Sequence, residues 1–333
     1  AVSVGKLNLS GGTLGGTGNV TTTGAFNITG PSTLSGTGTL TTQGTTTVNM
    51  GAATGNLNLI GGKTWVNEGT LTVGGDDYIY FGYSSGGSNT LTNAATGTLN
   101  LSSTYATPLN FYTGTATLNN AGTLNQTVSG THNAHGSIAF NNTGTVNVDA
   151  GTLSIDGGGT DTGLYAVDAG TTLDFAGGTR NLNAGSNVTG LGSLTVSGAT
   201  VNVNNLLDLS TSGTALNVSA GTLNLNSAVS VGKLNLSGGT LGGTGNVTTT
   251  GAFNITGYST LTGSGQLTTQ GATTIDMGVT NGYVSLTGGK TWVNEGTLTV
   301  GGDDFIYFGV STGGSNVLTN AAGGTLNLSS ANA

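Results

Sequence analysis

Short alternating segments closed by glycine recur along the whole chain, and this pattern constrains the fold more than any other feature. Residues 7–24, 26–44 and 46–62 each hold three such segments, so the pattern repeats about every 18 to 20 residues. Within a segment, as in residues 6–10 (KLNLS), apolar residues occupy every second position, as in a strand with one buried face. Three small strands alone would expose every edge, whereas stacked sets pair those edges in parallel. We therefore predict an all-β parallel β-helix (β-solenoid) with three short strands per turn and about 17 turns.

The composition agrees with this fold. Of the 333 residues 64 are Gly and only 5% are charged, whereas ordinary domains have about 7% Gly and 25% charged residues. Glycine and β-branched residues disfavour helices, and glycine suits corners where φ is positive. Asn and Thr can stack on identical residues of neighbouring turns, with side-chain hydrogen bonds along the axis.

The charge and hydropathy of the chain exclude two classes of binding partner, nucleic acids and the membrane interior. The net charge of −8 comes without clustered Lys and Arg, so we expect no binding to nucleic acid. No run of about 18 apolar residues predicts direct insertion into a membrane. The chain has no Cys, so no disulfide holds the fold together.

The chain also repeats on a longer scale. Residues 1–106 recur as residues 228–333, at an offset of 227 positions and with about four-fifths identity. No linker separates the copies, so we predict a first repeat unit, 1–227, and a partial second unit, 228–333, continuous in one solenoid.

Comparison of the two copies predicts which positions face inward. Apolar character is kept at three pairs that we expect to face the core: Val48 and Ile275, Leu57 and Val284, Tyr78 and Phe305. It changes at four pairs that we expect to face solvent: Pro31 and Tyr258, Asn49 and Asp276, Asn56 and Tyr283, Ile60 and Thr287.

The repeat style resembles a known group of proteins. Residues 142–155 (NTGTVNVDAGTLSI), 220–225 (AGTLNL) and 121–125 (AGTLN) are similar to repeats of filamentous-haemagglutinin-type exoproteins and autotransporter passengers, which are giant bacterial repeat adhesins. The resemblance covers essentially the whole chain, in repeat style and not in a diagnostic motif. It implies a right-handed three-faced β-helix, secretion to the cell surface, and roles in adhesion, self-association or biofilm.

Some β-helices are polysaccharide-degrading enzymes, and these need grouped carboxylates. A turn of about 19 residues would stack Asp149 and Asp168, which could place their carboxyl groups at the separation of a glycosidase pair, about 5 to 10 Å. Asp also occurs routinely in glycine-rich corners, where it accepts backbone N–H bonds. We therefore expect no enzyme activity, and keep a polysaccharide-binding or polysaccharide-degrading β-helix as the alternative.

Residues 74–82 (GGDDYIYFG) and 301–309 (GGDDFIYFG) form the strongest local motif. Carboxylates in glycine-rich turns can bind Ca²⁺, so Asp76, Asp77, Asp303 and Asp304 are candidate ligands. The other interpretation is a corner loop whose aromatic residues pack on the next turn. No other cofactor is expected.

Four aromatic residues are candidates for contacts with binding partners. Tyr258 and Tyr283 lie at positions that vary between the copies, and Trp65 and Trp292 could stack on sugars, so these four residues are candidate contacts. Threonine strings such as residues 45–47 raise a further alternative, an ice-binding solenoid, although Ser, Asn, Gln and Gly interrupt them. We predict an extracellular structural and adhesive fibre segment whose partners are other copies of itself, glycans or cell surfaces.

Overall fold

Strands three places apart in the chain pair in parallel, which is the arrangement that stacked three-strand turns require. The computed structural model describes residues 1–51, 54–209, 215–310 and 313–332, and these contain 45 strands and no helix. They form a right-handed parallel β-solenoid of about 14 turns. The predicted all-β parallel β-helix is confirmed.

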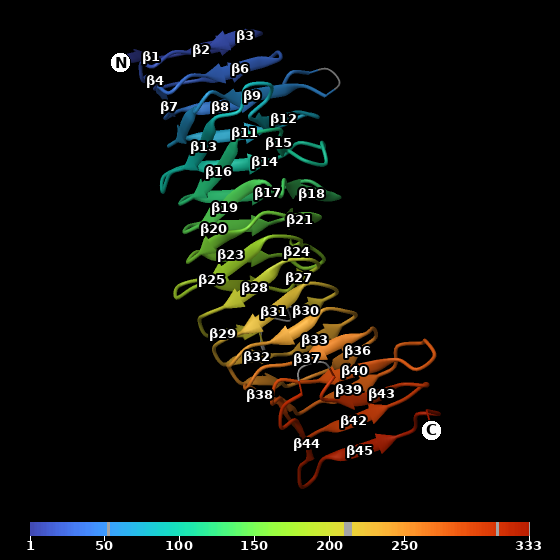
Figure 1. The fold of residues 1–333 in the computed structure, drawn as a ribbon. Helices are drawn as coiled ribbons and strands as arrows, with labels where there is room; N and C mark the ends of the chain where they lie inside the picture. Colours follow the sequence, from blue (N-terminus) through green and yellow to red (C-terminus); the bar gives the residue numbers. More distant parts are fainter. Residues whose placement is uncertain (52–53, 210–214, 311–312, 333) are drawn as a thin grey trace. The chain divides into compact units, whose positions relative to one another are not determined.

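The chain divides into two compact units, Ala1–Leu173 (unit 1) and Asp174–Ala333 (unit 2). In Figure 1 the strands of unit 1 run from blue to green and those of unit 2 from yellow-green to red, stacked turn upon turn within each unit. The division falls inside the first sequence repeat. The boundary of the repeat units 1–227 and 228–333 stays a prediction from the sequence.

Unit 1 has three parallel sheets. Sheet 1a consists of β1 (Val2–Val4), β4 (Val20–Thr22), β7 (Thr39–Thr42), β10 (Thr64–Asn67), β13 (Ser88–Asn93), β16 (Thr115–Asn120), β19 (Ile138–Asn142) and β22 (Gly159–Asp161). Sheet 1b consists of β2 (Leu7–Leu9), β5 (Phe26–Ile28), β8 (Thr45–Val48), β11 (Thr70–Val73), β14 (Thr98–Leu101), β17 (Thr123–Gln126), β20 (Thr145–Val148) and β23 (Leu164–Val167). Sheet 1c consists of β3 (Gly12–Leu14), β6 (Ser32–Ser35), β9 (Asn56–Ile60), β12 (Tyr78–Phe81), β15 (Leu109–Phe111), β18 (Thr131–Ala134) and β21 (Thr152–Ile155). The division between the units falls within β24 (Thr172–Phe175).

Unit 2 repeats this arrangement. Sheet 2a consists of β25 (Thr179–Leu182), β28 (Thr200–Val203), β31 (Thr222–Leu225), β34 (Thr240–Gly242), β37 (Ser259–Leu261), β40 (Tyr283–Leu286) and β43 (Phe305–Phe308). Sheet 2b consists of β29 (Leu207–Leu209), β32 (Val229–Val231), β35 (Val247–Thr249), β38 (Gln266–Thr269), β41 (Thr291–Asn294) and β44 (Val317–Asn320). Sheet 2c consists of β27 (Ser193–Val196), β30 (Ala215–Val218), β33 (Lys233–Leu236), β36 (Phe253–Ile255), β39 (Ala272–Ile275), β42 (Thr297–Val300) and β45 (Thr325–Leu328). Strand β26 (Asn187–Gly190) lies beside β29 but belongs to a different sheet.

Turn length varies more than the sequence pattern predicts. Paired residues one turn apart are 18 positions apart at Val2 and Val20, but 30 positions apart at Ile79 and Leu109. The longer turns carry extra residues in their corner loops while the strands keep their register. About 14 turns therefore form where the sequence pattern predicted about 17.

The core is built from the inward positions of each strand. In β9, Leu57 and Leu59 are fully buried, while Asn56, Asn58 and Ile60 are only partly covered. Val48, Ile275, Leu57 and Val284 are buried as predicted. The prediction that Tyr78 and Phe305 face inward is wrong, because alternation along β12 and β43 places Ile79 and Ile306 toward the core instead.

Asparagine side chains stack in register, as predicted from their ability to bond along the axis. On the outward side of sheet 1b, Asn125 donates to Asn100 and Asn147 donates to Asn125, both at 2.8 Å. A second ladder lies inside unit 1 at the ends of β10, β13, β16 and β19, and consists of Asn67, Asn93, Asn120 and Asn142, each at most 1% exposed. Side-chain hydrogen bonds thus run along the stack at the surface and in the interior.

Candidate functional site

The two tryptophans are core residues. Trp65 is fully buried in sheet 1a, in register between Leu40 and Leu91, and its indole N–H donates to Thr42 Oγ1 at 3.2 Å. Trp292 is equally buried in sheet 2b and donates to Thr269 Oγ1 at 3.1 Å. The prediction of surface contacts at Trp65 and Trp292 is wrong, because each indole occupies an inward strand position and has an internal acceptor.

The outward side of sheet 1c carries five tyrosines, which we call the unit 1 aromatic cluster: Tyr78, Tyr80, Tyr83, Tyr105 and Tyr112. Tyr78 and Tyr105 stack with ring centroids 4.4 Å apart and planes inclined by 16°. Tyr80 lies 5.5 Å from Tyr78, 5.4 Å from Tyr83 and 5.9 Å from Tyr112. Tyr83 and Tyr112 are 46% and 59% exposed, so the cluster is open to solvent.

Unit 2 has its own outward cluster in sheet 2a, the unit 2 aromatic cluster: Tyr258, Tyr283, Phe305 and Tyr307. The ring of Tyr283 lies 5.1 Å from that of Tyr258, 5.6 Å from Phe305 and 6.0 Å from Tyr307. Tyr258 is 52% exposed, and it borders with Tyr283 a hollow of about 190 Å³. The structure thus brings together Tyr258 and Tyr283, the two remaining predicted contacts, whose role in binding stays a prediction.

Alternation alone does not reveal which of these aromatic residues face outward. In β12 the four residues Tyr78, Ile79, Tyr80 and Phe81 are all apolar or aromatic, so the sequence does not show which pair faces outward. Tyr83, Tyr105 and Tyr112 lie outside the strands. Tyr83 follows Tyr80 in the same turn, whereas stacking of the next turn brings Tyr105 to Tyr78 and Tyr112 to Tyr80.

The Gly-Gly-Asp-Asp corners hold their carboxylates against backbone N–H groups. Asp77 is fully buried, and its two oxygens accept from Met50 N at 2.5 Å and from Gly55 N at 2.8 Å. Asp76 Oδ2 accepts from both the backbone N–H and the hydroxyl of Thr54. The carboxylates therefore clamp the corner loop of the preceding turn.

The second copy of this corner is similar. Asp304 Oδ2 accepts from Met277 N at 2.6 Å and Asp303 Oδ2 accepts from Asn281 N at 3.1 Å. Asp304 Oδ1 is buried and has no hydrogen-bond partner within the part of the chain that the structure describes. That part also contains no group of three or more His, Cys, Asp or Glu side chains placed to hold a metal ion. Calcium binding at Asp76, Asp77, Asp303 and Asp304 stays a prediction.

Asp149 and Asp168 stack as the turn length predicts. They directly follow Val148 and Val167, which are paired in β20 and β23, and both are exposed. Burial, and secondly the charge of Asp168, raise the pKa of the Asp149 carboxyl above its ordinary value. The pair is therefore the strongest carboxylate arrangement for the alternative of a polysaccharide-degrading enzyme.

Threonine forms columns in two sheets of unit 1. Paired positions hold threonine through four turns of sheet 1a and five turns of sheet 1b, at Thr39, Thr64, Thr90 and Thr117 and at Thr45, Thr70, Thr98, Thr123 and Thr145. The neighbouring outward column of sheet 1a is interrupted, with Val66 between Thr41 and Thr92. The ice-binding alternative stays a prediction.

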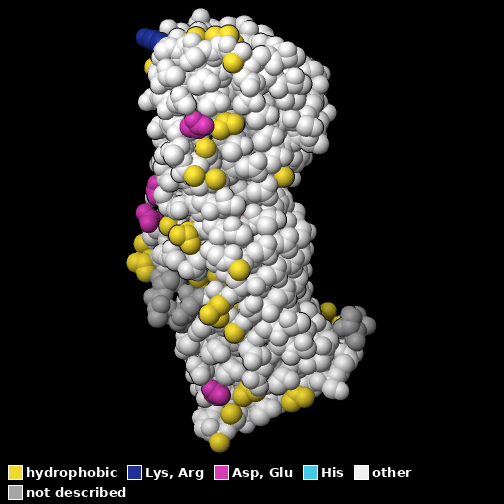
Figure 2. All heavy atoms as spheres, turned by 90° about the vertical axis from the view of Figure 1, so that its left-hand side faces the viewer, with side chains coloured by type: hydrophobic (Ala, Val, Ile, Leu, Met, Phe, Trp, Pro, Cys, Tyr) yellow, Lys and Arg dark blue, Asp and Glu magenta, His cyan; other side chains and the backbone are white. Residues whose placement is uncertain are grey.

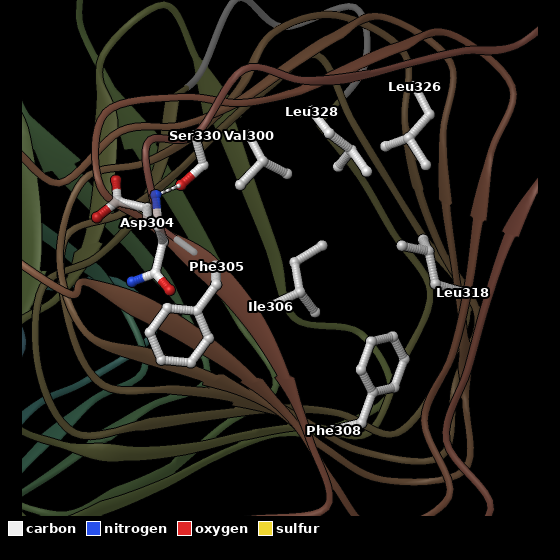
Figure 3. A pocket seen from close by; sticks show the side chains of 10 residues that line it. Val300, Asp304, Phe305, Ile306, Phe308, Leu318, Leu326, Leu328 and Ser330 are labelled. Carbon is white, nitrogen blue, oxygen red and sulfur yellow. Dashed lines mark hydrogen bonds between the residues drawn. The ribbon is translucent and has the colours of Figure 1, made fainter.

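A mostly apolar hollow lies at the last strands of unit 2. Figure 3 shows side chains from β42 to β45, among them Ile306, Leu318, Leu326 and Leu328, around a cavity of about 370 Å³. These are core-type positions: at the equivalent places in unit 1, Ile79, Leu91, Leu99 and Leu101 are at most 1% exposed. We assign this cavity no ligand.

Two equivalent lysines are buried, Lys63 and Lys290, each 1% exposed. Lys63 Nζ donates to Gly38 O at 2.7 Å, and burial lowers its pKa. Burial lowers the pKa of Lys290 further, to about 8. The ammonium of Lys290 is therefore an unfavourable group in folded unit 2 at neutral pH.

Raising the pH from 7 to about 9.5 is expected to stabilise unit 2. Between the folded pKa of about 8 and the unfolded value near 10.5, the unfolded chain binds more protons, so the free energy of unfolding rises with pH. Lys290→Met is expected to abolish this rise and to stabilise the protein at pH 7 by about 2 kcal/mol. Urea unfolding at both pH values measures it. Lys233→Met, at an exposed position in the same unit, is the matched control, and an equal pH response in all three proteins would contradict the assignment.

Comparison of the chain with protein-family models, curated proteins and solved structures found no match. The described residues contain no helix that is long and apolar enough to cross a membrane.

Proposed function

We propose that this chain is a segment of an extracellular fibre at a cell surface that gives reach and mediates adhesion or self-association. The observation that carries the proposal is the presence of an outward aromatic cluster in each unit, on a chain of which only 5% of the residues are charged. Exposed aromatic patches on soluble proteins mark interaction sites, because solvent-exposed rings lose unfavourable contact with water when a partner covers them.

The solenoid supports the structural half of this proposal. Each turn pairs its strands with the turns before and after it, and the core and asparagine ladders run from turn to turn. Such a fold gains length by adding turns, since each turn contacts only its neighbours. It needs no cofactor and performs no chemical step in this role.

The surface charge supports the adhesive half. Figure 2 shows a face on which Asp, Glu, Lys and Arg side chains are few and lie apart among uncharged groups. Like chains can approach such a surface without strong repulsion. Contacts between copies, or with glycans and cell surfaces, would then depend on rings, amides and hydroxyls.

Beads coated with the chain are expected to aggregate or to adhere to cells, whereas albumin-coated beads are not. Because the contacts are largely uncharged, the effect should persist from about 0.05 to 0.5 M salt. Flow cytometry of the bead suspension measures it. Dispersed beads and no adhesion would contradict the proposal, as would polysaccharide turnover by the chain that Asp149→Asn and Asp168→Asn together abolish.

A further inference from the structure

We propose that the unit 1 aromatic cluster is a binding platform for neutral glycan chains, an inference that rests on the adhesive function proposed above. The platform consists of Tyr78, Tyr80, Tyr83, Tyr105 and Tyr112 together with the outward asparagines in register beside them.

The rings offer apolar faces of the size of a sugar ring. Tyr83 and Tyr112 are the most exposed members, and their centroids lie 5.9 Å from each other, with Tyr80 within 5.9 Å of both. Tyr78 and Tyr105 stack on each other beside this trio and restrict the motion of Tyr78. Ordered rings lose little conformational entropy when a ligand covers them, so they are efficient contact residues.

Polar groups flank the rings at fixed register positions. Tyr80 is paired with Asn58 in β9 and with Asn110 in β15, and Tyr78 is paired with Asn56. Internal bonds use part of their capacity, because Asn56 donates to Asn58, Asn58 donates to Thr33 Oγ1, and Asn110 accepts from Phe111 N. Each amide keeps a further N–H donor or acceptor lone pair for a ligand. A pyranose presents C–H groups on its faces and hydroxyls at its edges, and this alternation of apolar and hydrogen-bonding groups matches rings flanked by amides.

The charge of the site favours an uncharged ligand. All five cluster members are tyrosines, and the neighbouring acid Asp76 already accepts two hydrogen bonds from Thr54. Burial, and secondly the neighbouring tyrosines, raise the pKa of Tyr78 and Tyr80 above the ordinary value, so their hydroxyls stay protonated. None of these residues is a cation that could form an ion pair with the carboxylates of an acidic glycan.

The second repeat supports a role in binding. At the offset of 227 positions, Tyr83 becomes Val310 and Tyr105 becomes Asn332, but Asn56 becomes Tyr283 and Pro31 becomes Tyr258. The unit 2 aromatic cluster thus keeps rings at the counterparts of Tyr78 and Tyr80 and adds Tyr258 and Tyr283. These two added tyrosines border the hollow of about 190 Å³ together with Ser259, Thr260 and Ser285. The second repeat therefore loses two tyrosines that follow the strand and gains two tyrosines in the preceding turn. These positions face solvent, so packing of the core does not require an aromatic residue there.

The test uses the full chain with Tyr258→Ala and Tyr307→Ala, so that unit 2 contributes little signal. Isothermal titration calorimetry with cellohexaose, maltohexaose and xylohexaose measures neutral glycans, and hexagalacturonate provides the acidic comparison. At least one neutral hexamer is expected to bind, and hexagalacturonate is not.

Adding Tyr83→Ala and Tyr112→Ala should weaken binding about tenfold or more. Adding Leu164→Ala instead should leave binding unchanged, since Leu164 has the same 46% exposure as Tyr83 but lies outside the cluster.

Three results would overturn the inference: no neutral hexamer bound at millimolar concentration, unchanged binding after Tyr83→Ala and Tyr112→Ala, or equal binding of hexagalacturonate. Circular dichroism establishes that each variant is folded. If these two substitutions abolish bead aggregation without any glycan binding, the cluster is a protein contact, and the adhesive function stands while the glycan inference fails. If the unsubstituted chain neither aggregates nor adheres, the proposed function itself fails.

Discussion

Replacing Asn120 by alanine is expected to lower the free energy of unfolding by about 3 kcal/mol. Asn120 accepts from Asn93 Nδ2 at 2.8 Å, and donates to Asn142 Oδ1 at 2.9 Å and to the Thr145 carbonyl at 3.0 Å. The substitution leaves two buried side chains, Asn93 and Asn142, and the part-buried Thr145 carbonyl without that hydrogen bond. An unsatisfied buried polar group costs about 1 to 3 kcal/mol, and water has little access to compensate.

Asn119→Ala is the matched control, because Asn119 is the preceding residue of the same strand and faces outward. It accepts one hydrogen bond, from Asn141 Nδ2 at 3.0 Å, at a partly exposed site. Its loss is expected to cost about 0.5 kcal/mol. Denaturant unfolding of both variants measures the difference. Equal destabilisation would show that the inward ladder contributes no more than a surface one.

The inward ladder fixes one corner in the successive turns that contain it. Asn93, Asn120 and Asn142 end their strands in sheet 1a, and each donates to the carbonyl of the first residue of a strand in sheet 1b. The amide that stacks on its neighbour therefore also ties the two sheets together. In these turns of unit 1 a single Asn therefore stabilises both the corner and the register with the next turn.

Replacing Gly144 by alanine is also expected to destabilise the protein by about 3 kcal/mol. A Cβ at this position would overlap the Gly122 carbonyl oxygen and lie 2.6 Å from the Ala121 carbonyl carbon. Both atoms belong to the backbone of the preceding turn and cannot rotate away. Thermal unfolding followed by circular dichroism measures the effect.

Gly5→Ala is the control within the same column of corner glycines. That column runs through Gly5, Gly24, Gly44, Gly69, Gly97, Gly122, Gly144 and Gly163, and a Cβ at Gly5 meets no atom within 4 Å. Gly5→Ala should therefore change the free energy of unfolding by less than about 1 kcal/mol. A small increase is expected, because alanine lowers the conformational entropy of the unfolded chain. If Gly144→Ala were equally mild, the close approach of successive corners would not limit the residue type there.

The sequence predicted part of the candidate site. The predicted turn length placed Asp149 above Asp168 correctly, because the one turn that separates them has the predicted length of about 19 residues. It did not place the tryptophans, since Trp65 and Val66 in β10 give an apolar pair whose inward member depends on register with Leu40 and Leu91. It also missed Tyr83, Tyr105 and Tyr112, which lie outside the alternating strands.

Alternation, glycine spacing and repetition in the sequence determined that the chain is an all-β solenoid with three strands per turn. Alternation buries one face of each short strand, and only the stacking of successive turns also pairs the exposed strand edges. They also determined the inward aliphatic positions, such as Val48 and Leu57. Only the tertiary structure decided which polar residues are buried. Asn93 and Asn120 are 27 positions apart, and they meet because turns of unequal length keep their strands in register. Register across turns is a property of the stacked backbone, and local patterning cannot encode it when the corner loops differ in length.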